Sequence, residues 1–227
     1  MALPLYSGFY TIRNRASLTR IDLQRGESIS RSSIFLITRN VLFSLKMRGL
    51  IGKKADGTKV IGWTPHQPND SGYLNQVWEI QPSSKTEGHY TIVNAKTGTY
   101  LEVVDGVGAH CKNKTADGQG LDGSQVTCSK AAAGEDTPSY QEWKFIMGPW
   151  EYLGSNGIVH AASGLLLDME GGSSTDGTKI QIHRSTQDIG ALKELLWHIE
   201  HTGYSKPGTQ TAVVPMPADS EAIQNDA

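Results

Sequence analysis

The chain has 227 residues, a formal net charge of −2 and 37% hydrophobic residues, which is enough for one domain with a sizeable core. The near-neutral charge argues against a general nucleic-acid-binding protein, although residues 1–54 carry ten Lys and Arg against two acidic residues. An apolar run at 34–46 is interrupted by Arg39 and is shorter than 18 residues, so we expect no membrane insertion.

The start of the chain lacks a basic segment followed by an apolar one, so no signal peptide is visible. The two cysteines, Cys111 and Cys128, are fewer than a secreted fold stapled by disulfides would carry. We therefore expect a cytoplasmic protein, with unconventional export as the alternative. Cys128 lies in a predicted strand, where we expect a small buried apolar residue.

Short runs rich in β-branched and aromatic residues recur along the chain and end in turn-forming residues. They predict four strands in each of three successive segments, and the only helical feature we expect is a single turn near 191–196. In chain order, the expected strands lie at or directly after 10–12, 19–23, 56–60, 76–80, 90–93, 100–103, 122–126, 141–145, 157–159, 165–169, 176–180 and 195–199.

The three segments match one another at three sets of positions along the sequence. Each closes on a Trp, at positions 78, 143 and 197, and each has an Asp-Gly turn whose Gly precedes that Trp by 20 or 21 residues. Further upstream, eight residues separate a turn residue from an acidic one in every copy, at 14 to 22, 94 to 102 and 160 to 168. These anchors identify a threefold internal repeat. Twelve strands in three copies predict an all-β fold, a β-trefoil of three four-stranded lobes with pseudo-threefold symmetry. We expect Trp78, Trp143 and Trp197 to fill its core.

The repeat also sets the expected domain boundaries. One trefoil domain spans residues 1–203, with lobes at about 6–81, 82–147 and 148–201. Two insertions break the register, at about 24–53 and 105–118. The first is either a genuine loop or untranslated sequence retained in a gene model. Residues 204–227 show no pattern and predict a flexible C-terminal tail.

The Trp-centred segments carry a resemblance to a known family. Gln76 and Gln141 stand two residues before Trp78 and Trp143, and this Gln-x-Trp motif resembles the ricin B-type (R-type) lectins. The first lobe, through the stretches 8–14, 21–23 and 57–80, is similar to the small mushroom lectins of this family. The resemblance covers about residues 6–201 and implies a carbohydrate-binding β-trefoil.

The first lobe also offers the chemistry of a shallow sugar site. Such a site needs a carboxylate beside a side-chain amide to bind neighbouring hydroxyls, and an aromatic ring to pack against the C–H face of a pyranose. Asp22, Asn75 and Trp63 supply these three groups, while His66 and Tyr73 lie in the loop between them. The resemblance implies the same sugar contacts for Asp22, Trp63 and Asn75. It assigns Gln76 a structural role, supporting the loop and Trp78.

The other two lobes depart from this set. In the second lobe Glu102 replaces the Asp and Tyr140 replaces the Asn, so we expect no sugar site there. The third lobe keeps Asp168 and has His183 at the aromatic position, which makes it a candidate for a weak second site. Glu194 takes the place of the amide, and we expect it to repel Asp168.

The sequence contains no enzymatic motif in the structural setting that the motif requires. Residues 118–123 match G-x-G-x-x-G, but a strand follows them, so no helix N-terminus faces a phosphate. The sequence contains no Gly-x-Ser-x-Gly elbow and no zinc-ligand spacing. We therefore expect no enzymatic activity, no metal and no cofactor.

The predicted function is recognition of galactose- or N-acetylgalactosamine-type glycans of glycoproteins or glycolipids through the first lobe. The alternative is a trefoil protease inhibitor or protein-interaction module whose sugar site does not function, because a fold alone does not decide function. A single weak site per chain would gain avidity from self-association, so we expect a homodimer.

Overall fold

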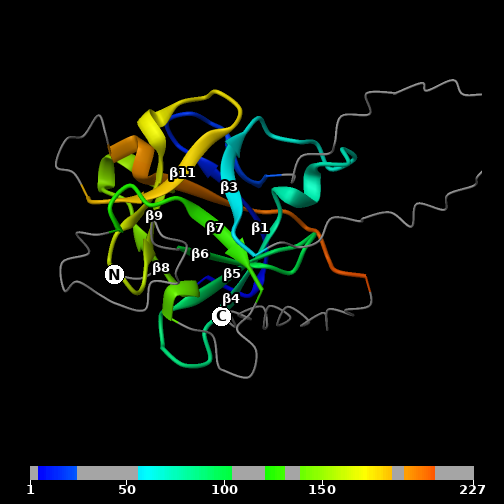
Figure 1. Ribbon diagram of the computed structural model, residues 1–227, viewed down its shortest axis with the longest axis horizontal. Coiled ribbons are helices and arrows are strands. Elements are labelled where there is room, and N and C mark those ends of the chain that lie inside the picture. The colour runs from blue at the N-terminus through cyan, green and yellow to red at the C-terminus, as the bar shows by residue number, and fades with distance from the viewer. Residues whose placement is uncertain (1–4, 25–55, 104–120, 131–138, 186–191, 208–227) are drawn as a thin grey trace, which may run out of the picture.

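The computed structural model of the protein describes residues 5–24, 56–103, 121–130, 139–185 and 192–207. Twelve strands form a β-trefoil, so the predicted fold is confirmed (Figure 1). Both predicted insertions lie outside the described residues apart from Gln24. In lobe order, the strands are β1 (Gly8–Asn14), β2 (Arg20–Leu23), β3 (Thr58–Trp63) and β4 (Trp78–Pro82); β5 (Tyr90–Asn94), β6 (Tyr100–Val103), β7 (Val126–Ser129) and β8 (Trp143–Met147); and β9 (Asn156–His160), β10 (Leu166–Met169), β11 (Thr178–His183) and β12 (Leu196–His201).

The first and fourth strands of the lobes close into a barrel. Antiparallel pairing runs from β1 to β4, β5, β8, β9 and β12 and back to β1, which leaves no free edge in this ring. The hairpins β2–β3, β6–β7 and β10–β11 cover one end of the barrel. β3 pairs with both β7 and β11, so the three hairpins also contact one another (Figure 1).

Short 3-10 turns connect the strands. Three of them, η1 (Tyr73–Asn75), η3 (Ser139–Gln141) and η6 (Lys193–Leu195), lead into the Trp of each lobe, and η6 is the helical turn expected near 191–196. The others described are η4 (Trp150–Tyr152) and η5 (Glu170–Gly172). In the part of the chain that the structure describes, no helix is long and apolar enough to cross a membrane.

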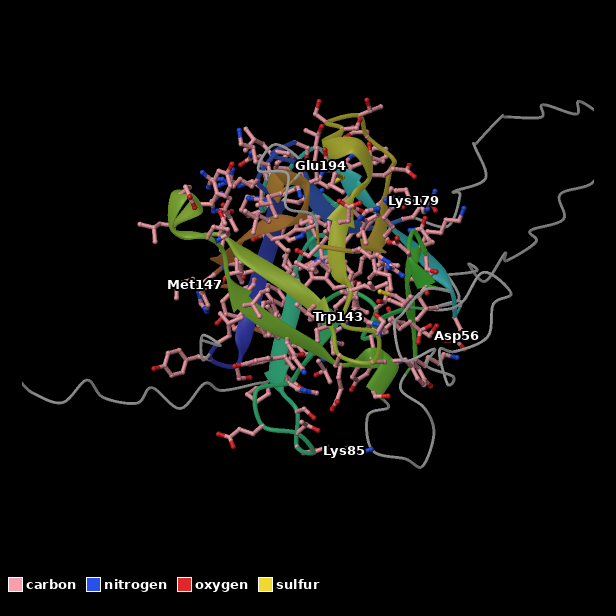
Figure 2. The ribbon with its side chains drawn as sticks, turned by 90° about the vertical axis from the view of Figure 1, so that its left-hand side faces the viewer. Asp56, Lys85, Trp143, Met147, Lys179 and Glu194 are labelled. Carbon is pink, nitrogen blue, oxygen red and sulfur yellow. The ribbon has the colours of Figure 1, made fainter. Side chains whose placement is uncertain are left out.

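The three repeated Trp residues form the centre of the core, as predicted. Trp78, Trp143 and Trp197 are each 0% exposed, and Figure 2 shows Trp143 inside the ribbon while Lys85 lies at the periphery. Their indole Nε1 atoms donate to equivalent carbonyls on the second strand of each lobe, at Ile21, Leu101 and Leu167. Each indole therefore buries its ring and satisfies its one donor. Cys128 is also buried, as expected, and burial raises the pKa of its thiol.

The Asp-Gly turns join the lobes in a cycle. Asp176 of the third lobe accepts from the Thr64 backbone N–H at 2.6 Å, at the end of β3 in the first lobe. Asp56 accepts from the Lys130 N–H and Asp122 from the Arg184 N–H in the same way. The glycines adopt a positive φ of 78–88°, which lets each turn place its Asp against the next lobe. We call these three contacts the aspartate clasps.

One side chain lies on the pseudo-threefold axis. The Nε2 of Gln125 lies 2.8 Å from the carbonyl oxygen of Val60 and 2.9 Å from those of Val126 and Ile180, and these three residues occupy equivalent positions in β3, β7 and β11. The three carbonyls converge where the hairpins meet, and the NH2 group of Gln125, which has two N–H donors, lies within hydrogen-bonding distance of all three.

A second repeated contact connects each lobe to the preceding one. The Oδ1 of Asn14 accepts from the turn that follows β1, and its Nδ2 donates to the Glu194 carbonyl at 2.8 Å. Asn94 repeats this with the Asn75 carbonyl at 2.9 Å. His160 replaces the Asn in the third lobe, with Nδ1 at 2.9 Å from Ser163 Oγ and Nε2 at 3.1 Å from the Tyr140 carbonyl.

Replacing Leu18 with Gly is expected to raise the free energy of unfolding by about 0.5–1 kcal/mol in urea titrations. Leu18 has φ 61°, while the equivalent residues Gly98 and Gly164 have φ 69° and 75°. A left-handed conformation costs a non-Gly residue roughly 1–2 kcal/mol, which exceeds the backbone entropy that Gly loses on folding. Leu18 is 54% exposed, so little burial is lost. Gly164→Ala is the matched control and should destabilise. A less stable Leu18→Gly variant would contradict this account.

The chain that follows β12 contacts the barrel where the predicted tail begins. The Thr202 N–H donates to the Phe9 carbonyl at 2.9 Å, and the Tyr204 ring meets the Phe9 ring edge-on with centroids 4.9 Å apart. An aromatic pair of this kind stabilises the contact beyond its buried area. Residues 208–227 lie outside the described part of the chain.

Candidate functional site

A cavity of about 300 Å³ lies in the first lobe, between the β2–β3 hairpin and η1. Four of the five residues predicted as sugar contacts line it, together with Gln24, Ile61 and Gly177. These four are Asp22, Trp63, His66 and Asn75. Tyr73, the fifth, lies on η1 beside Asn75 and is not among the lining residues.

Strand register brings the carboxylate and the ring to one side of the hairpin. Asp22 of β2 pairs with Ile61 of β3, and Trp63 is the last residue of β3, two positions further on. Alternate residues of a strand share a face, so Ile61 and Trp63 both point toward the cavity. The 3-10 turn η1 carries Asn75 to the opposite wall.

Asp22 is more buried than the predicted shallow site would require. The residue is only 4% exposed, because it sits between β3 and the chain leading into Trp78. Its Oδ2 accepts from Gln76 Nε2 at 2.9 Å. The carboxylate is therefore fixed in one orientation by the amide of the Gln-x-Trp motif.

Gln76 also fixes the loop that borders the cavity. Its Nε2 donates to the Thr64 carbonyl at 3.0 Å, and its Oε1 accepts from the His66 N–H at 2.9 Å. The His66 carbonyl accepts from Arg20 Nη1 at 3.2 Å. Supporting the loop is the role that the resemblance implied for Gln76. The contribution of Arg20, a strand residue away from the motif, had no sequence signal.

Asn75, which lines the cavity, carries a buried donor without a hydrogen-bond partner. Its Nδ2 is buried and has no hydrogen-bond partner among the described residues, although the Asn75 carbonyl is bound by Asn94. A buried amide without a partner costs about 1–3 kcal/mol, so such groups in native proteins call for an explanation. A ligand acceptor in the cavity would pair with it.

The imidazole of His66 lies between two carboxylates at the mouth of the cavity. Its Nε2 is 3.8 Å from Asp22 Oδ2, and its Nδ1 is 3.6 Å from Asp70 Oδ2. The side chain is partly exposed, so the ring can contact both the protein and a ligand. The cavity thus combines a carboxylate, an amide, an indole and an imidazole.

Comparison with known proteins shows what the chain is similar to. Residues 74–183 match the family described as a ricin-type β-trefoil lectin domain-like family. The resemblance to the ricin-type lectins is confirmed. No curated protein sequence matches the chain.

Solved structures share the fold at low identity. The agglutinin of Rhizoctonia solani shares 19% identity, covers 89% of this chain and 100% of its own, and has a TM-score of 0.55. The ricin B-like lectin of Macrolepiota procera, solved in complex with lactose, shares 20% identity, with 88% and 100% covered and a TM-score of 0.54. The designed threefold symmetric protein ThreeFoil shares 19% identity, with 86% and 99% covered and a TM-score of 0.55. These similarities show the fold.

In the second lobe, the corresponding carboxylate is buried and bound by neighbouring side chains of the protein. Glu102 is 0% exposed; its Oε2 accepts from Gln141 Nε2 at 2.9 Å, and its Oε1 accepts from the Ser129 hydroxyl. Ser129 occupies the position of Trp63, so the group that would stack on a sugar is replaced by one that binds the carboxylate. Tyr140, at the position of Asn75, is also buried.

The third lobe contains an amide that the sequence prediction missed. Gln181 of β11 lies opposite Asp168, and its Nε2 donates to Asp168 Oδ2 at 2.8 Å. Burial raises the pKa of Asp168, and the carboxylates of Glu170 and Asp122 add to this rise. Cross-strand pairing across the β10–β11 hairpin was the sequence signal that would have identified Gln181.

His183 lies at the rim of this third site. Its Nε2 is 3.8 Å from Asp122 Oδ1 and its Nδ1 is 3.0 Å from the Arg184 carbonyl, so the imidazole already has protein partners. Among the described residues, no group of three or more His, Cys, Asp or Glu side chains is arranged to hold a metal ion.

Proposed function

We propose that the protein is a lectin that binds galactose- or N-acetylgalactosamine-type glycans through the first-lobe cavity. The match to the ricin-type lectin family supports carbohydrate binding in general, and binding rather than catalysis. The observation that carries the first-lobe assignment is the unpaired Nδ2 of Asn75 in the same cavity as the Asp22 carboxylate and the Trp63 ring.

These three groups complement one sugar ring. The carboxylate of Asp22, held by Gln76, accepts from one hydroxyl, and the Asn75 amide donates to a neighbouring hydroxyl oxygen. The Trp63 indole packs against the C–H face of the pyranose. The galactose-type preference is consistent with the lactose bound to the Macrolepiota procera lectin, which has the same fold.

Replacing Asn75 with Ala is expected to weaken glycan binding at least tenfold and to leave the free energy of unfolding almost unchanged. Its Nδ2 makes no hydrogen bond to the described residues, so removing it relieves an unpaired buried donor, and this gain offsets the packing that the substitution loses. The ligand loses a donor. Isothermal titration with lactose and N-acetylgalactosamine gives the affinity, and urea titration gives the stability. We expect a wild-type Kd between about 40 µM and 1 mM, or 4–6 kcal/mol.

Trp63→Ala and His183→Ala form the matched pair for lobe assignment, since both side chains end the third strand of their lobe. Binding should be lost with Trp63→Ala and kept with His183→Ala. The reverse result would move the site to the third lobe. Normal lactose binding by both Asn75→Ala and Trp63→Ala would contradict the first-lobe assignment and require a sugar site elsewhere. No glycan binding by the wild type would contradict the proposal as a whole and favour a protein-binding trefoil. Asp22→Ala is less informative, because the buried Gln76 amide would lose its carboxylate partner.

A single millimolar-to-micromolar site gives little occupancy on a cell surface. Linking two sites raises the effective affinity without any new contact at either site. The proposed lectin therefore gains from self-association, and a twofold symmetric homodimer is the simplest closed assembly.

A further inference from the structure

A second groove, of about 700 Å³, lies on the outside of the barrel where the first lobe meets the second. Phe9, Glu79, Gln81, Tyr100, Tyr204 and Lys206 are among the residues that line it. None of them lines the first-lobe cavity.

The floor of the groove is a row of side chains across four neighbouring strands. Phe9 of β1 pairs with Glu79 of β4, Glu79 pairs with Val93 of β5, and Val93 pairs with Tyr100 of β6. Laterally paired residues point to the same face of a sheet, so all four side chains lie on one surface. Their sequence neighbours, such as Trp78 and Ile80, point into the core (strands β4, β5 and β6 in Figure 1).

The chain after β12 forms one wall. Thr202 holds this segment to β1 through the Phe9 carbonyl, and its Oγ1 accepts from the Tyr204 N–H at 3.1 Å. The Tyr204 ring then rests on the edge of Phe9. Two aromatic rings at this wall and Tyr100 across the floor give the groove apolar surfaces separated by polar groups.

A carboxylate and an amide are joined on this floor. Gln81 Nε2 donates to Glu79 Oε1 at 2.6 Å, and the two residues share a face of β4 because they are two positions apart. Gln81 is the partner of Glu79 among the described side chains. The pair repeats the chemistry of Asp22 and Gln76, on a different strand and outside the hairpin cap.

We propose that this groove is a second carbohydrate site, which binds an uncharged oligosaccharide of two or more rings. The Glu79–Gln81 pair binds neighbouring hydroxyls, and Phe9, Tyr100 and Tyr204 provide surfaces for sugar rings. Lys206 lines the same groove, so a cationic ligand would meet a like charge, while an acidic sugar would face Glu79. The inference stands apart from the first-lobe assignment, since the two sites share no lining residue.

The test is an amide chemical-shift titration of the full chain with a panel of uncharged oligosaccharides of two to four rings. At least one panel member should shift the amide signals of Gly8, Tyr100 and Gly203, which line the groove. Those shifts should persist in Trp63→Ala, which removes the first-lobe stack. Glu79→Ala should weaken this binding at least tenfold.

Glu87→Ala is the matched control, because Glu87 is an exposed carboxylate in the β4–β5 loop outside the groove. It should leave the groove shifts unchanged. Choline, a small cation, is titrated beside the sugars as the probe for a cationic ligand. The proposal is overturned if no panel member shifts the groove amides, or if the shifts survive Glu79→Ala. It is also overturned if choline shifts these amides and the sugars do not. If the sugars shift the groove amides of the wild type but not the amides of Asn75 and Trp63, the first-lobe site is refuted and the groove is kept. The two failures are therefore distinguishable.

Discussion

Replacing Trp143 with Ala is expected to lower the free energy of unfolding by about 3–5 kcal/mol. The indole is 0% exposed, its Nε1 donates to the Leu101 carbonyl at 3.0 Å, and its ring lies 5.1 Å from the His160 ring. The substitution opens a cavity at the centre of the core and leaves a buried carbonyl without its donor. Chemical denaturation followed by circular dichroism measures the loss.

Leu153→Ala is the control for this substitution, because Leu153 is 73% exposed and its truncation should change the stability by less than about 0.5 kcal/mol. If Trp143→Ala were as stable as Leu153→Ala, the repeated Trp residues would not be the centre of the core.

Acid is expected to destabilise the protein through His160, by about 2–3 kcal/mol between pH 7.5 and pH 4.5. Burial lowers the pKa of His160 from 6.5 to about 4. In this window the unfolded chain binds a proton that the folded chain excludes, so stability falls as pH drops from about 6.5 toward 4. A pKa difference of about 2.5 corresponds to roughly 3 kcal/mol at its limit.

His160→Asn isolates this contribution. Asn14 and Asn94 fill the equivalent turns in the other lobes and do not titrate, so the variant should keep the fold. On acidification its free energy of unfolding should fall by about 2–3 kcal/mol less than that of the wild type. Urea titrations of both proteins at the two pH values measure the difference, in which the acidic residues common to both cancel. An identical pH dependence in the two proteins would show that His160 is not the titrating group.

The fold was predictable because the sequence contains the same constraints three times. A single Gln-x-Trp motif says little, but the Trp, the Asp-Gly turn and the turn residue at 14, 94 and 160 recur at matching intervals. These are the residues that fill the core, clasp the lobes and connect each lobe to the one before. A repeated residue that performs a structural task leaves a periodic signal.

The site was predictable in composition and less so in geometry. Residue types and spacing identified Asp22, Trp63, His66 and Asn75, which line one cavity. The depth of Asp22 was not visible, because it depends on how the chain before Trp78 lies over β2. Gln181 was missed for a related reason: it reaches Asp168 across a strand pair, a relationship that linear spacing within a motif does not express.

The contact between Tyr204 and Phe9 shows a third limit of prediction from the sequence. The two residues lie almost the full length of the chain apart. A long-range aromatic contact leaves no local pattern in the sequence.

The aspartate clasps bear on how this protein folds. Each turn is completed by a backbone N–H of the following lobe, and the third turn is completed by the first lobe, so the lobe formed last must close onto the one formed first. A lobe excised by itself would retain its Asp and lose the N–H that the Asp binds. It would also lose the neighbouring strands that close the barrel. A single lobe is therefore not an autonomous folding unit, and the three lobes gain their stability together, in one cooperative transition.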